Sequence, residues 1–146
     1  MSLRYRTIAV VCSAGLYLAA LLLPAVNIYT RGTGGDCSHA FAGHEAFHMG
    51  WAALVAQDSW DVHRGVLALG WLVNPAIWAA LGFLAAGRCC WAGSAAAMGL
   101  VLALAVFPWY YALVWDQPGY WAWLASAALL LERSWFAAIR LRTHIL

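Results

Sequence analysis

The sequence has few charged residues and no lysine. Only 10% of its 146 residues are Asp, Glu, Lys or Arg, and all eight basic residues are arginines. The formal net charge is +2, far short of the basic surface with which a nucleic-acid-binding protein neutralises phosphates. We therefore expect no nucleic acid among the partners of this protein.

Cysteine is also sparse and lacks a metal-binding or redox spacing. The four cysteines are Cys12, Cys37 and the adjacent pair Cys89 and Cys90. None of them forms the C-x-x-C unit that is typical of a zinc knuckle or a thioredoxin-like centre. Cys37 has no evident disulfide partner, so it is either a free thiol, a loop ligand or one half of an intermolecular disulfide.

Apolar residues are abundant, at 65% of the chain, against roughly 45–50% in an average soluble domain. So much apolar surface does not fit inside one small water-soluble domain. Four runs are long enough to cross a bilayer core of about 30 Å: residues 8–28, 65–87, 91–114 and 120–136. The first run follows Arg4 and Arg6 like a signal peptide, but it is long and has no small-x-small cleavage site, so we interpret it as a retained span.

The stretch of residues 42–57 is less apolar than the four runs, and the arginines decide its placement. If it lies on the surface, six of the eight arginines fall on one side of the membrane, as the positive-inside rule requires. The sequence therefore predicts an all-α polytopic membrane protein, a single domain over residues 1–146, with four transmembrane helices. Both termini are expected on the cytoplasmic side of a bacterial inner membrane, and residues 42–57 form an amphipathic extracytoplasmic helix between spans one and two.

Asn74 and Pro75 are the main irregularity inside a predicted span. Pro75 removes a backbone donor and frees a carbonyl one turn earlier, so we expect a kink there. The Asn74 side chain needs a hydrogen-bond partner in the membrane. A neighbouring helix that satisfies the break is the favoured interpretation, and a ligand or ion site at the break is the alternative.

One motif has possible chemistry. His44, Glu45 and His48 form H-E-x-x-H, in which two His residues one helical turn apart bind zinc and the Glu acts as general base on the metal-bound water. The extended form of the motif fails, because its third-ligand position holds Leu54. Candidates for a third ligand lie in the same predicted loop: His39, Asp58, Asp61 and His63.

Imidazole, thiolate and carboxylate groups in one loop suit zinc or copper. The sequence leaves three interpretations open: a loop that collects the polar residues excluded from the spans, a metal site without catalysis, and a zinc-dependent membrane hydrolase with Glu45 as base.

Short elements over nearly the whole chain resemble those of small bacterial four-span membrane proteins that have no assigned activity. The matching stretches are Leu23-Pro24, Gly43 to Trp51 as G-x-E-A-x-x-x-G-W, Trp71 to Pro75 as W-L-x-N-P, and Gly119 to Ala125 as G-Y-W-x-W-L-A. The resemblance implies a structural role for Glu45 and Trp51, with His44 and His48 as local features. It also suggests that Glu45 holds the loop helix on the spans through Trp71 or Asn74.

Taken together, these features favour a non-enzymatic protein that lies in the lipid bilayer. We expect it to act as an accessory or structural subunit that packs against other membrane proteins or against itself.

Overall fold

A computed structural model of the chain describes residues 3–32, 35–55, 62–114 and 116–143. In chain order these residues form α1 (Leu3–Leu22), β1 (Pro24–Gly32), β2 (Gly35–Ala42), α2 (Gly43–Val55), α3 (Val62–Ala85), α4 (Cys89–Val114) and α5 (Pro118–Thr143). The predicted helical class is thus confirmed, with the addition of one β-hairpin.

Three of the helices are long and apolar enough to cross a membrane: Arg4–Leu22 in α1, Arg64–Ala85 in α3 and Cys89–Pro108 in α4. This finding is consistent with an integral membrane protein. α5 has the length of a span but contains Glu132 and Arg133, and among the described residues it is not one of the three.

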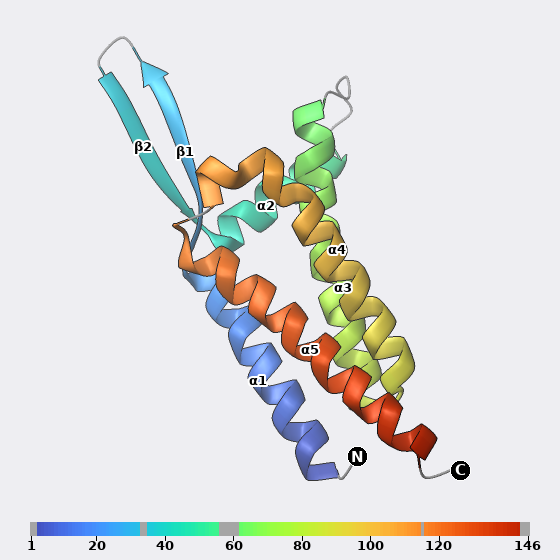
Figure 1. The fold of residues 1–146 in the computed structure, drawn as a ribbon. Helices are drawn as coiled ribbons and strands as arrows, with labels where there is room; N and C mark the ends of the chain where they lie inside the picture. The colour runs from blue at the N-terminus through green and yellow to red at the C-terminus, as the bar shows by residue number, and fades with distance from the viewer. Residues whose placement is uncertain (1–2, 33–34, 56–61, 115, 144–146) are drawn as a thin grey trace.

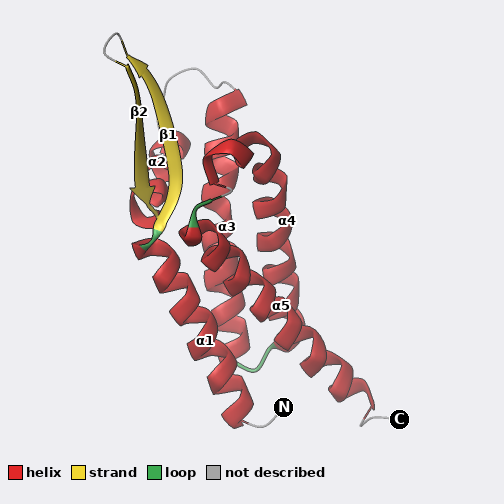
Figure 2. Ribbon diagram, turned by 60° about the vertical axis from the view of Figure 1, so that its left-hand side comes forward, coloured by secondary structure: helices red, strands yellow, loops and turns green. Residues whose placement is uncertain are grey.

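The four long helices form a bundle, in which α5 packs against α1 and α4, and α3 packs against α4 and more lightly against α1 (Figures 1 and 2). Both termini lie at one end of this bundle (Figure 1). The hairpin and α2 lie at the other end, which we call the hairpin end. The turn between α3 and α4 lies at the end with the termini. Its Gly87 is close to the Arg6 side chain of α1, since a Cβ on Gly87 would lie 2.7 Å from Arg6 Nη1.

The hairpin corrects the prediction for residues 23–42. The first apolar run was expected to continue as a helix to residue 28, but α1 ends at Leu22. Leu23 precedes Pro24, and a residue before proline is disfavoured in helical conformation. Strand β1 then pairs antiparallel with β2, from Pro24 opposite Ala42 to Gly32 opposite Gly35, with an irregularity next to Pro24. The β-branched and aromatic residues of this segment favour a strand once the helix has stopped.

α3 ends in a glycine cap. Gly87 has a φ of +79°, which costs glycine little because it has no Cβ. Its amide donates to the Leu84 carbonyl at 3.0 Å, and the Arg88 amide donates to the Phe83 carbonyl at 2.8 Å. These two bonds make a Schellman motif, and the sharp reversal lets α4 return directly along α3.

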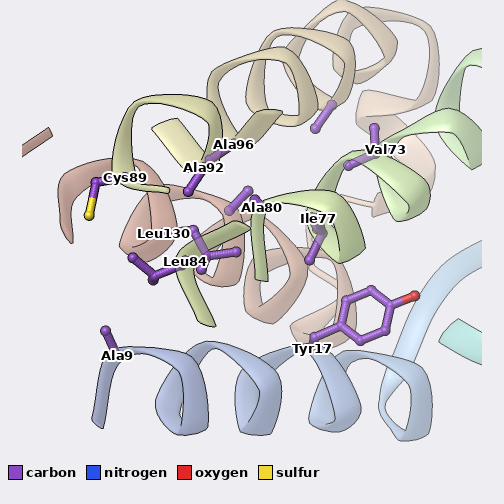
Figure 3. Close-up of a cluster of buried hydrophobic side chains, with 12 residues drawn as sticks. Ala9, Tyr17, Val73, Ile77, Ala80, Leu84, Cys89, Ala92, Ala96 and Leu130 are labelled. Carbon is purple, nitrogen blue, oxygen red and sulfur yellow. The ribbon is translucent and has the colours of Figure 1, made fainter. Parts of the chain in front are cut away.

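The core lies between the helices and is built largely from small residues. Alanines of α4 and α5 pack against larger side chains of α3, which allows the helix backbones to approach closely. Figure 3 shows cluster members from α1, α3, α4 and α5 pointing into the same space. Fully buried members are Val73, Ile77, Ala80 and Leu84 of α3, Ala92 and Ala96 of α4, and Leu130 of α5.

Candidate functional site

α2 lies across the hairpin end of the bundle and is fastened at its beginning to the end of α1. The Gly43 amide donates to the Leu23 carbonyl at 3.0 Å. His44 Nδ1 lies 3.1 Å from the Leu21 carbonyl oxygen, so this nitrogen carries the proton, because a carbonyl only accepts. Both bonds satisfy backbone carbonyls at the end of α1, which have no amide donor within the helix.

The Glu45 carboxylate caps α2. Its Oε2 accepts the Ala42 amide at 2.8 Å, which is the bond made by the third residue of a helix in a capping box. The resemblance suggested that Glu45 holds the helix down on the spans through Asn74 or Trp71. Aromatic rings make that connection: Phe47 lies 5.7 Å from Trp71 and 6.0 Å from Trp78, and Trp51 lies 5.1 Å from Trp71, measured between ring centroids.

Two further contacts fix the remainder of α2. Gly50 is buried against α3, and a Cβ on it would approach the Trp71 Cβ to 2.8 Å. Near the end of α2, the Ala53 carbonyl accepts a hydrogen bond of 2.7 Å from Nε of the buried Arg64. A cation at the carboxyl end of a helix is also favoured by the helix dipole. Sequence reasoning missed this bond, because no local pattern relates Arg64 to Ala53.

The Asn74 side chain repairs the break that Pro75 makes in α3. Proline has no amide hydrogen, so the carbonyl four residues earlier, that of Trp71, loses its helical donor. Asn74 Nδ2 donates to this carbonyl at 2.9 Å, and Asn74 Oδ1 accepts from the Tyr17 hydroxyl at 3.0 Å. The predicted need of Asn74 for a partner is thereby met twice, once within α3 and once across to α1.

Below α2 lies an apolar cavity of about 270 Å³ that is partly open at the surface. All five helices and the base of the hairpin contribute to its walls. Its principal lining residues are Leu21, Val26, Phe47, Met49, Leu67, Gly70, Trp71, Asn74, Val106, Phe107, Tyr120 and Trp123. Sequence reasoning did not find this cavity, because it depends on how the elements pack together, although Trp71 and Asn74 were singled out from the sequence.

The predicted metal ligands are only partly brought together. His44 and His48 lie one turn apart on α2, both exposed, and His39 lies exposed on β2. Asp58 and Asp61 lie outside the described residues, as do the side chains of His63 and Cys37. Within the part of the chain that the structure describes, no three His, Cys, Asp or Glu side chains are close enough to hold a metal ion.

No family model, no curated protein and no solved structure matches this chain. Its function is therefore inferred from the geometry of the hairpin end.

Substitution of Glu45 tests whether its side chain caps α2. We expect Glu45→Ala to lower the free energy of unfolding by about 1 kcal/mol, the usual cost of a lost cap. Glu45→Gln is expected to keep most of the stability, because an amide oxygen also accepts the Ala42 amide. Unfolding titrations of the two variants in mixed micelles measure the difference, and equal losses of stability would contradict the capping role.

Proposed function

We propose that this chain is a non-enzymatic integral membrane protein that serves as an accessory subunit of a larger membrane complex. The observation that carries the proposal is the hairpin, which extends away from the helix bundle (Figures 1 and 2). Among the described residues, β1 and β2 pair only with each other. A two-stranded hairpin gains little stability alone in water, and an unpaired strand edge is suited to accept a strand from a partner.

The proposal includes four spans, with α5 as the fourth. A helix of the length of Pro118–Thr143 is about 39 Å long, enough to cross a bilayer core of about 30 Å. Its packing along α1 and α4 supports this placement. Glu132 and Arg133 then lie just past the middle of α5, and their long side chains would extend toward the interface at the end of the bundle that carries the termini.

The distribution of arginines supports cytoplasmic termini in a bacterial inner membrane. Arg4, Arg6 and Arg88 belong to the end of the bundle with the termini, as does the carboxyl-terminal part of α5 with its arginines. Arg31 in the hairpin and Arg64 at the start of α3 belong to the hairpin end. The excess at the end with the termini is what the positive-inside rule requires of the cytoplasmic side.

A binding role rather than catalysis is supported by the use of the polar side chains at the hairpin end. Glu45 caps α2, His44 and Arg64 bond to backbone carbonyls, and Asn74 bonds to Tyr17 and to the Trp71 carbonyl. A general base needs a lone pair directed at substrate. These groups instead join one element of the fold to the next.

Shortening the hairpin tests the subunit proposal. Replacing residues 30–37 by an Asn-Gly turn leaves Tyr29 opposite Ser38 as the last strand pair and suits a two-residue hairpin connection. We expect the full-length protein, isolated from its native membrane in mild detergent, to migrate on a native gel as part of a larger complex. We expect the shortened variant to be released from that complex.

Ser94→Ala, an exposed position on α4, serves as the control and should remain in the complex. Migration of the wild type as a lone monomer would overturn the proposal, and a complex of identical chains would assign the partner as a second copy.

Metal binding is the second candidate function, and one observation favours it. The contact of His44 Nδ1 with the Leu21 carbonyl leaves Nε2 for a metal, and a metal-binding His commonly donates its other ring hydrogen to a carbonyl in this way. His48 follows one turn later on the same helix. A third ligand would come from outside this pair. Catalysis at an open fourth position would also require the Glu45 carboxylate to leave the Ala42 amide that it accepts in this structure.

Elemental analysis of protein purified without a histidine tag tests this candidate. Near-stoichiometric zinc or copper that is lost in the double variant His44→Ala, His48→Ala would support a metal site. Retention of the metal in Glu45→Gln, with loss of a hydrolytic activity, would support the zinc hydrolase. Absence of metal from the wild type would exclude both.

A further inference from the structure

The cavity below α2 has the character of a binding site for an apolar chain. Its walls are apolar except for the polar groups of a few side chains, such as Asn74, Tyr120 and Trp71. In the proposed bilayer placement, on which this inference rests, the medium around the bundle is lipid, and the molecules most available to fill such a space are those dissolved in it. Apolar cavities of this kind do not hold water, which needs polar partners.

The size of the cavity fits part of a long alkyl or isoprenoid chain. A dry cavity of about 150 Å³ in another protein is large enough to hold benzene. The cavity here, at about 270 Å³, has nearly twice that volume. Its partly open form allows the rest of a long molecule to remain outside.

One polar group of a residue that lines the cavity is left without a partner. The indole Nε1 of Trp71 is buried and has no hydrogen-bond acceptor among the described residues. The other polar side chains are already engaged: Asn74 with Tyr17 and the Trp71 carbonyl, and the Tyr120 hydroxyl with the Ala103 carbonyl at 3.1 Å. A buried donor without an acceptor is costly. The nitrogen has almost no accessible surface, so an occupant with an acceptor oxygen would satisfy it only if the Trp71 ring turns toward the cavity.

We propose that this cavity binds the apolar chain of a membrane amphiphile that carries a carbonyl oxygen, and that the Trp71 ring turns to donate its indole hydrogen to that oxygen. The ester of a glycerolipid and the ring carbonyl of an isoprenoid quinone both offer this chemistry. The hairpin lines this site only at its base, through Ala25 and Val26. The site does not depend on the proposed complex, so it would be present in the isolated chain.

Gly70 and Gly82 of α3 provide a matched pair of variants. Gly70 lines the cavity, and a Cβ there would meet only Val106 Cγ1, at 3.8 Å. A leucine at this position therefore extends into the space that the ligand would occupy. Gly82 is exposed on the same helix, and a Cβ there would meet nothing within 4 Å. Gly82→Leu thus adds the same side chain to the same helix without filling the cavity.

The experiment titrates the full-length protein in detergent with two probes that quench tryptophan fluorescence, a phosphatidylglycerol with dibrominated acyl chains and a decyl-substituted benzoquinone. We expect saturable quenching by at least one probe, and the probe that saturates identifies the source of the chain. Gly70→Leu should weaken this binding at least about tenfold, because it displaces several methylene groups from the cavity. Gly82→Leu should bind like the wild type.

Quenching by both probes that rises without saturation, or equal binding by the two leucine variants, would overturn the proposal. Gly70→Ala guards against a folding defect in Gly70→Leu, because its Cβ makes only an ordinary contact. It should fold normally and show a smaller loss of binding, and binding as tight as that of the wild type would count against the site.

Trp71→Phe tests the proposed anchor. If the indole donates to the ligand, this variant should bind the saturating probe several-fold more weakly. If the indole donates to no ligand, Trp71→Phe should leave probe binding unchanged. Loss of the unpaired indole N–H should then be neutral or stabilising for the fold. Trp91→Phe is the control, because Trp91 is exposed and lies just after the turn at the opposite end of the bundle.

Discussion

Gly43→Ala is expected to destabilise the protein by about 3 kcal/mol, at the upper end of the usual cost of overpacking. A Cβ at this position would fall on the carbonyl oxygen of Ala20 and come within 2.9 Å of the Leu21 Cα. Both are backbone atoms at the end of α1, so no side-chain rotation relieves the clash. The first turn of α2 would have to move away from α1.

The sign of this effect is informative, because glycine to alanine within a helix ordinarily stabilises by roughly 0.5–1 kcal/mol. Gly15→Ala in α1 is the matched control, since a Cβ at Gly15 would meet nothing within 4 Å. Unfolding titrations in mixed micelles give the two free energies. A Gly43→Ala variant as stable as Gly15→Ala would show that α2 does not rest on α1 in this way.

Movement of α2 also has a local signature. The hydrogen bonds from the Gly43 amide to Leu23 and from His44 to Leu21 join α2 to α1, and both should be lost in Gly43→Ala. Faster hydrogen exchange confined to the amides of α2 would report this loss, since exchange measures local opening. Unchanged exchange across α2 would contradict the proposed contact.

The sequence predicted the helical class well because long apolar runs and glycine or proline at their ends are local signals. The exception is the segment after Leu22, where the apolar run continues through Pro24 into a strand. Hydropathy does not distinguish a helix from an apolar strand over so short a stretch. Pro24 and the β-branched residues after it were the signals that could have corrected the prediction.

The candidate site was predictable only in part. Asn74 and Pro75 are adjacent, so their relation is local and was visible in the sequence. The partner of Asn74 in α1, Tyr17, is distant in sequence and required the fold to be known. Likewise, the pattern around Glu45 indicated a role in the loop helix but not which amide the carboxylate accepts.

The second large effect is expected at Asn74. Asn74→Ala would remove the donor to the Trp71 carbonyl and the acceptor of the Tyr17 hydroxyl. Two buried polar groups would then lack partners, and we expect the free energy of unfolding to fall by about 2 kcal/mol. Unfolding titrations in mixed micelles measure this loss. Leu72→Ala, an exposed position on α3, serves as the control and should cost less.

A double-mutant cycle with Pro75→Ala tests the mechanism of that loss. An alanine at position 75 has an amide hydrogen that can donate to the Trp71 carbonyl, so the Asn74 side chain would no longer be needed for that bond. We therefore expect Asn74→Ala to cost about 1 kcal/mol less in the Pro75→Ala protein than in the wild type. The remaining cost of Asn74→Ala would come from the Tyr17 hydroxyl, which loses its acceptor in both proteins. Equal costs in the two proteins would mean that Asn74 does not replace the donor that proline lacks.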